Sequence, residues 1–350
     1  MIWLTLRQFR VQAAVVFGGL AVLCAALAIT GPGMADEFNS GFASCTAQGD
    51  CSRFTRRFFE DHEMAFGAVI LIVAFLPGLI GIFWGAPLIT REIEQGTHRL
   101  VWNQSITRTR WLAVKLAVVG VAAMVAAGLA ALAADWWSDP IDKAASDDIS
   151  RITPLVFLSR GIVPIGYAAF AFALGVTVGV IVRRTLPAMA ITLAVFVGLQ
   201  VAVPMWIRPN IIPAESKIVA ITSENHGEMM MMREEGDKAF LQVEVEPEPR
   251  AWTFTNETVD SSGKKVGRLP VSVAAGAPCA PPPPGPDGEP PEGPSQACFD
   301  DLAKKGYKQK VAYHPADRFW PLQWAETGLF VVLALGLTGL CFYWTRRRLS

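Results

Sequence analysis

REIEQGTHRLVWNQSITRTRW, residues 91–111, is the stretch that decides how this sequence is interpreted. It is densely polar and lies between two long apolar runs, near Ala65–Leu88 and Trp111–Ala134. Each run has the roughly 20 residues that a transmembrane helix needs. The segment is therefore predicted to be a short loop that projects from a membrane, and its pattern is typical of a docking element.

Composition places the whole chain among integral membrane proteins. Of its 350 residues, 52% are hydrophobic and only 18% are charged, a balance unlike that of a soluble domain. The formal net charge of zero gives no indication of a nucleic-acid partner. Six apolar runs are long enough to span a bilayer: Val11–Gly31, Ala65–Leu88, Trp111–Ala134, Gly161–Val182, Leu186–Ile207 and Trp324–Trp344. We expect an all-α polytopic membrane protein with six transmembrane helices.

The first of these runs is predicted to remain as a helix, because it lacks the clear small-residue cleavage site of a signal peptide. Basic residues then predict the orientation, since short loops rich in Lys and Arg stay in the cytoplasm. If six helices alternate, one side receives the basic flanks: Arg7, Arg10, Arg91, Arg99, Arg108, Arg110, Arg183, Arg184 and Arg346–Arg348. The opposite loops are rich in Asp and Glu. Both termini are therefore predicted to be cytoplasmic.

A long polar stretch between the fifth and sixth helices predicts an external insert. It covers residues 208–319, after a membrane domain of residues 1–207 and before the sixth helix and basic tail, residues 320–350. Phe240–Glu246 and Ala251–Val259 alternate apolar and polar residues, as half-buried strands do. The Pro-rich loop 277–294 cannot join a sheet. We expect a small β-containing lobe outside the membrane.

The cysteines agree with this topology. Cys45 and Cys51 fall in the first external loop, and Cys279 and Cys298 bracket the Pro-rich part of the insert. Two local pairs on the outside fit two structural disulfides in an oxidising compartment. Four free thiols are the alternative, because connectivity cannot be read from a sequence.

Within the polar segment, Glu92 and Glu94 would belong to the end of the second helix. Gly96 and Thr97 would terminate it, since glycine is common just past a helix C-terminus. Residues 99–104 can form a short helix across the membrane axis, with Trp102 among its apolar anchors and Arg99 as a charge-pairing group.

The third helix would start shortly afterwards, capped by Ser105, Thr107 or Thr109. Lys115, one turn into this helix, could extend back to the inner surface. A solvated loop whose charges merely follow the orientation rule is the plain alternative for the segment.

Several motifs together resemble the permease subunits of type-2 ABC exporters, particularly the actinobacterial kind. The central one combines Phe83–Leu88, Arg91–Thr97 and Gln104–Trp111 with Lys115-Leu116. The opening residues 3–10 and the late residues 314–324 are also similar to that family. The resemblance covers the membrane helices from end to end and is weakest in the external insert.

This resemblance implies a transport subunit that works with other chains. In such exporters the loop between the second and third helices carries a coupling helix that seats in a separate ATPase, and an amphipathic N-terminal helix lies along the inner leaflet. The residues that this implies for ATPase coupling are Arg91, Glu92, Glu94, Gly96, Thr97, Arg99, Trp102, Gln104, Ser105, Thr107 and Arg108.

The sequence contains no phosphate-binding loop, so ATP and Mg are expected in the partner ATPase and no cofactor or catalytic residue is assigned to this chain. A second permease copy, in a homo- or heterodimer, would complete the exporter in the plasma membrane. Because the spans contain few ionisable residues away from their ends, a lipophilic or amphipathic solute is expected. Gln200, Thr177 and Thr192 are the mild polar candidates for contacting it.

Some features of the sequence suggest classes of function other than an exporter. His226 with Glu224, Glu228 and Met229–Met232 offers metal-ligand types, but the spacing matches no firm site and we assign no metal. A membrane enzyme would need a convergent catalytic set, which the scattered histidines do not supply. A membrane-bound sensor or assembly protein, with a ligand-binding external lobe, remains the alternative function.

Overall fold

The structure, a computed structural model, describes residues 2–47, 49, 51–96, 107–145, 150–223, 225–233, 238–274, 276–280 and 295–347. The chain divides into two compact units. A membrane unit contains residues 1–211 and 319–350, and a lobe contains residues 212–318. Each unit has its own core.

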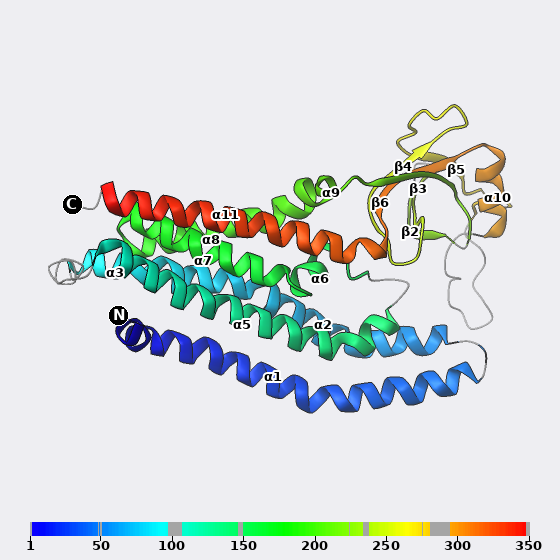
Figure 1. The fold of residues 1–350 in the computed structure, drawn as a ribbon. Coiled ribbons are helices and arrows are strands. Elements are labelled where there is room, and N and C mark those ends of the chain that lie inside the picture. Colours follow the sequence, from blue (N-terminus) through cyan, green and yellow to red (C-terminus); the bar gives the residue numbers. More distant parts are fainter. Residues whose placement is uncertain are drawn as a thin grey trace. The chain divides into compact units, whose positions relative to one another are not determined.

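Six helical stretches of the described chain are long and apolar enough to cross a membrane, as predicted. They are α1 (Ile2–Thr46), α2 (Ser52–Ile80) continued by η1 (Gly81–Gly85) and α3 (Ala86–Glu94), α5 (Arg108–Ala144), α7 (Val163–Val182), α8 (Thr185–Ala202) continued by η2 (Val203–Ile207) and α9 (Arg208–Ile211), and α11 (Phe319–Arg347). They run lengthwise beside one another in the membrane unit (Figure 1). The short α6 (Pro154–Ser159) precedes α7.

Two helices are much longer than the apolar runs that predicted them. α1 starts at Ile2 and continues through Pro32 to Thr46, so residues 2–10 are its first turns rather than a separate amphipathic helix. Beyond the apolar run, Met34 and Phe38 are buried in a cluster with Phe58 of α2. This packing continues the helix past the point where hydropathy falls.

α5 likewise continues past Ala134 to Ala144. Two residues expected in an acidic loop, Asp135 and Asp142, are therefore helical. Both lie beside Arg160, whose guanidinium is buried and donates to Asp142 Oδ1 at 3.1 Å. The ion pairs explain how the helix tolerates these carboxylates.

α7 is the central helix of the membrane unit, and most of its side chains are buried. Its glycines allow a very close approach to the π-helical turn η1. A Cβ atom on Gly175 would lie 2.2 Å from the carbonyl oxygen of Gly81 and 2.8 Å from the amide nitrogen of Ala86. Small residues commonly mediate such close helix packing in membranes.

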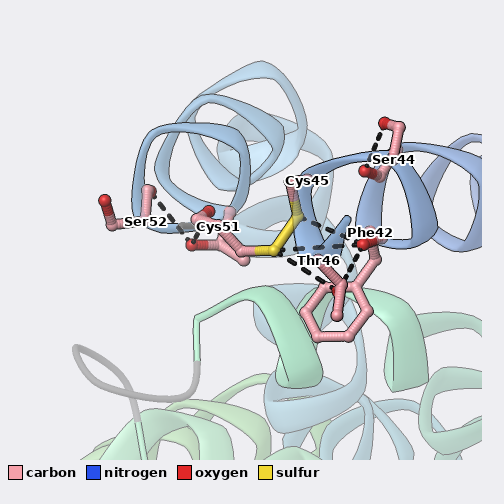
Figure 2. Close-up of a disulfide and its surroundings, with 8 residues drawn as sticks. Phe42, Ser44, Cys45, Thr46, Cys51 and Ser52 are labelled. Atoms are coloured by element: carbon pink, nitrogen blue, oxygen red, sulfur yellow. Dashed lines mark hydrogen bonds between the residues drawn. A yellow bond between two sulfur atoms is a disulfide. The ribbon is translucent and has the colours of Figure 1, made fainter. Parts of the chain in front are cut away.

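α1 and α2 are joined at one end by a disulfide between Cys45 and Cys51, whose Cα atoms are 5.0 Å apart. Figure 2 shows this link beside Phe42 and Thr46 of α1. The Thr46 hydroxyl donates to the Phe42 carbonyl at 2.7 Å, which completes the last turn of the helix. The covalent link therefore closes the α1–α2 hairpin directly after α1 ends.

The lobe contains two three-stranded antiparallel sheets. One has the order β1 (Glu215–Ala220), β6 (Lys308–His314), β4 (Trp252–Val259), and the other has the order β2 (His226–Arg233), β3 (Lys238–Val245), β5 (Leu269–Ser272). The strands β3 and β4 confirm the two strands predicted from alternation. The helix α10 (Gln296–Lys304) joins the core through Cys298, which forms a disulfide with Cys279.

A polar cluster fastens β1 within the lobe. Lys217 donates to Glu248, and the Tyr313 hydroxyl donates to the same carboxylate at 3.1 Å. These hydrogen bonds, chiefly that from Lys217, hold the pKa of Glu248 below its ordinary value. The carboxylate therefore stays charged and keeps the cluster intact at neutral pH.

Arg208, where we expected the insert to begin, lies in the membrane unit as the first residue of α9. It is fully buried, and its Nε and Nη2 atoms donate to the two carboxylate oxygens of Glu326 at 2.8 and 3.0 Å. The Tyr167 hydroxyl also donates to Glu326, at 2.9 Å. This cluster fixes α9 to α11 and α7.

Candidate functional site

The candidate site is built around the C-terminal end of α3. This helix ends at Glu94, and Gly96 follows with a left-handed backbone, φ = +69°. Glycine adopts that conformation without steric cost, so Gly96 terminates the second transmembrane helix where we predicted. The backbone amide of Gln95 donates to the Arg91 carbonyl at 3.0 Å and completes the last turn.

Glu92 connects this helix end to α5. Its carboxylate forms an ion pair with Lys115 in which the two side chains are only 14% and 4% exposed. The Lys115 ammonium also lies 5.0 Å from the centroid of the Trp111 ring. Our expectation that Lys115 extends to the inner surface is therefore wrong: the cation is buried because a carboxylate is available inside the bundle. Removing one member of such a buried pair leaves an uncompensated charge.

Glu94 connects the same helix end to α8. Its two carboxylate oxygens accept hydrogen bonds from the Thr185 amide at 2.9 Å and the Thr185 hydroxyl at 2.6 Å. The first amides of a helix have no partner within the helix, and a carboxylate satisfies them well. Arg183 adopts a left-handed backbone, φ = 60°, which ends α7 and permits the tight turn into α8. Glu94 thus caps a helix that is distant in sequence.

On the other side of the polar segment, Thr107 caps α5. Its hydroxyl accepts a hydrogen bond from the Arg110 amide at 3.3 Å. Arg108 is the first residue of the helix. Close by, Arg346 at the end of α11 donates from Nε to the Thr109 hydroxyl at 3.3 Å. One end of the bundle therefore gathers the ends of α3 and α11 and the starts of α5 and α8.

The structure places six of the predicted coupling residues at the two ends of the polar segment. These are Arg91, Glu92, Glu94, Gly96, Thr107 and Arg108. The other five, Thr97, Arg99, Trp102, Gln104 and Ser105, lie outside the described residues, as does the predicted short helix. Arg91 is exposed, whereas the carboxylates of Glu92 and Glu94 are both engaged by other helices.

Each of the three polar residues that we considered for solute contacts donates a hydrogen bond to a backbone carbonyl. Thr177 donates to Ala173 O at 2.7 Å, Thr192 donates to Ala188 O at 2.7 Å, and Gln200 donates to Ala74 O at 2.9 Å. These bonds stabilise helices and their packing. The side chains of Thr177 and Thr192 are also buried.

Sequence reasoning missed Thr185 and the Arg208–Glu326–Tyr167 cluster. A threonine between two apolar runs, with Pro187 two residues later, does indicate a helix start, but nothing local identifies Glu94 as its partner. As for metals, no group of three or more His, Cys, Asp or Glu side chains suited to an ion occurs in the described ranges. Glu224 and the side chains of His226 and Glu228 are not among the groups that the structure describes.

Comparison with known proteins identifies the family. A family described as "ABC-2 membrane transporter related" matches residues 17–208, which is more than half of the chain and runs from within α1 to the start of α9. No curated protein and no solved structure matches the sequence. The matched region contains most of the first five membrane helices and all of the predicted coupling residues. The chain therefore belongs to the ABC-2 membrane transporter related family and is a multi-pass permease of the ABC-2 type.

Proposed function

We propose that this permease is the membrane-spanning subunit of a type-2 ABC exporter in the plasma membrane. In this proposal a separate ATPase docks on residues 89–111, and a second permease copy completes the transport path. The observation that carries the proposal is the pair of carboxylates at the end of α3. Glu92 holds α5 through Lys115, and Glu94 holds α8 through Thr185.

Through these two contacts, a movement of the polar segment can be transmitted to α5 and α8. An ATPase that closes on ATP would displace the end of α3. The Glu92–Lys115 pair would then displace the start of α5, and the Glu94–Thr185 hydrogen bonds would displace the start of α8. Coupling of this kind needs two global states with different affinities for the ATPase conformations. In this proposal this end of the bundle faces the cytoplasm, as its basic flanks favour.

An apolar groove supports a lipophilic or amphipathic solute. It has a volume of about 420 Å³ and lies between α5, α7 and α11. Gly120, Phe172 and Leu335 contribute to an almost wholly apolar wall, in which Thr338 supplies a hydroxyl. The buried charges of Lys115 and Arg208 are paired with carboxylates. A desolvated ion would find little compensation along such a wall.

The test is affinity purification of the permease, followed by reconstitution with the ATPase that co-purifies. It measures ATPase retention, ATP hydrolysis and solute transport separately. Arg99→Ala, in the predicted docking helix, should reduce ATPase retention. Thr185→Val removes the partner hydroxyl of Glu94 and should leave ATPase retention intact while lowering transport per ATP hydrolysed. Thr192→Val is the matched control, because the Thr192 hydroxyl bonds only within α8, to Ala188 O.

Normal transport in both Arg99→Ala and Thr185→Val would count against docking and transmission at this site. Retrieval of a kinase or another regulator, with no ATPase, would instead favour the membrane-bound sensor or assembly protein. Equal loss of coupling in Thr185→Val and Thr192→Val would assign the effect to general destabilisation of α8.

A further inference from the structure

A polar cavity lies beside the candidate site and is not explained by ATPase docking. It has a volume of about 180 Å³ and is lined by the first turns of α1, by α3 and by α5. A single water needs only roughly 10–15 Å³ measured in this way, so the cavity has room for a larger polar group. Its polar wall is formed by Thr5, Gln8, Gln12, Arg91, Glu92 and Lys115.

The charges of this wall favour an anion. Lys115 is 3% exposed and forms an ion pair with Glu92. Arg91 adds a second cation to the wall. The wall therefore has a net positive charge. Thr5 and Gln8 add neutral hydrogen-bond donors from α1.

The surroundings of the cavity favour an anion that carries apolar chains. On the first turns of α1, Ile2, Trp3 and Leu6 are 59%, 68% and 50% exposed. Phe83, whose carbonyl accepts a hydrogen bond from Gln12 at 3.2 Å, is 52% exposed. Exposed apolar side chains such as these contact lipid tails when the helix lies in a membrane. A ligand with a phosphate and acyl chains would match both the polar cavity and the apolar side chains around it.

We propose that this cavity binds the headgroup of an acidic phospholipid, with the phosphate held by Arg91 and Lys115 and the tails lying along the start of α1. Basic pockets between helices are a known way to bind such headgroups. The bound lipid would fasten α1, which has few buried residues along its length, to α3 and α5. Because Glu92 forms part of the wall, the lipid would also stabilise the helix end that leads into the polar segment.

The test uses the full-length permease alone in bilayer nanodiscs of phosphatidylcholine, with or without about one fifth phosphatidylglycerol. Native mass spectrometry measures the retained phosphatidylglycerol, and thermal unfolding measures the stabilisation. Arg91→Gln should lower retention about tenfold or more, because it removes charge-assisted hydrogen bonds to the phosphate. Arg10→Gln is the matched control, because Arg10 is an exposed basic residue on α1 that does not line the cavity. It should lower retention by no more than about fivefold, the effect of one basic residue near an anionic lipid surface.

Three results would overturn the proposal. Arg91→Gln could retain phosphatidylglycerol like the natural sequence, or Arg10→Gln could lose it equally, which would indicate diffuse attraction. Inorganic phosphate added to the phosphatidylcholine discs could also stabilise the protein as much as phosphatidylglycerol does, which would indicate a site for free phosphate. No ATPase is present, so each result is independent of the proposed docking.

Discussion

Buried charges in the membrane unit occur in pairs, and this explains both where they are tolerated and what they do. Lys115 pairs with Glu92, and Arg208 pairs with Glu326. In each case the two residues belong to different helices, so the pair fixes one helix to another. An unpaired charge in such a place would be strongly destabilising. Each ion pair therefore compensates the buried charge and links two particular helices.

The Glu92–Lys115 link predicts a particular pattern of stabilities. Lys115→Met leaves the Glu92 carboxylate buried without its cation, and should lower the free energy of unfolding by roughly 3–5 kcal/mol. The double variant Glu92→Gln/Lys115→Met removes both charges and should recover most of that loss, because an uncharged pair of similar volume has no desolvation penalty to offset. Denaturant unfolding in detergent micelles measures the free energy of unfolding of the natural full-length protein, the single variant and the double variant.

This pattern is specific to a buried ion pair. If the double variant is as unstable as Lys115→Met, the Lys115 side chain contributes through its packing on Trp111 rather than through its charge. If neither variant loses stability, the pair does not hold α3 to α5. In that case the proposed route of movement from the polar segment to α5 would also fail.

At the scale of helices, close packing of α7 against η1 defines the centre of the unit. Gly175→Ala would place a methyl group 2.2 Å from Gly81 O, closer than real Cβ contacts come, so the two backbones must separate. Such overpacking should lower the free energy of unfolding by about 1–3 kcal/mol. Gly198→Ala in α8 is the control, since a Cβ at that position meets no heavy atom within 4 Å. Thermal unfolding of both variants in nanodiscs measures the difference; equal stabilities would show that α7 and η1 can separate freely.

Helix number was predictable from the sequence, but helix length was not. Hydropathy alone locates six spans because a bilayer requires long apolar runs. It ends the first span at Gly31, before Pro32, whereas α1 continues to Thr46. The extension depends on contacts of Phe38 with α2 residues such as Phe58, at 5.3 Å between ring centroids. Contacts between helices leave no local trace in a hydropathy profile.

The candidate site was predictable to the same limited degree. A glycine after a charged helix end predicts a helix C-terminus, and a threonine before the next apolar run predicts an N-cap. Gly96 and Thr107 adopt these two roles. The partner of Glu94 is 91 residues away in the chain, and that of Arg208 is 118 residues away. One sequence contains no information about which distant polar groups meet. Such pairs follow only from the packed bundle.

At the scale of the whole molecule, the residues of the lobe lie in the sequence between two parts of the membrane unit. The residues on either side of the lobe are brought together by the pairing of Arg208 with Glu326. Ile211 follows Arg208 by about 4.5 Å of helix, and Phe319 precedes Glu326 by roughly 10 Å, at 1.5 Å per residue. The membrane unit therefore closes on itself through α9 and α11, without needing a contribution from residues 212–318.

This arrangement predicts that the lobe can be removed. Residues 212–318 are replaced by a Gly/Ser linker of about twelve residues. Its root-mean-square end-to-end distance of ~19 Å is comparable with the distance expected between Ile211 and Phe319. We expect normal membrane insertion and unchanged retention of the ATPase, because the Glu92–Lys115 and Arg208–Glu326 ion pairs both lie within the membrane unit. Fluorescence-detected gel filtration and co-purification measure these two properties. The same deletion carrying Arg208→Leu is the comparison, and it should aggregate because Glu326 is then buried without its cation. Aggregation of the simple deletion as well would show that the lobe is required for folding of the membrane unit.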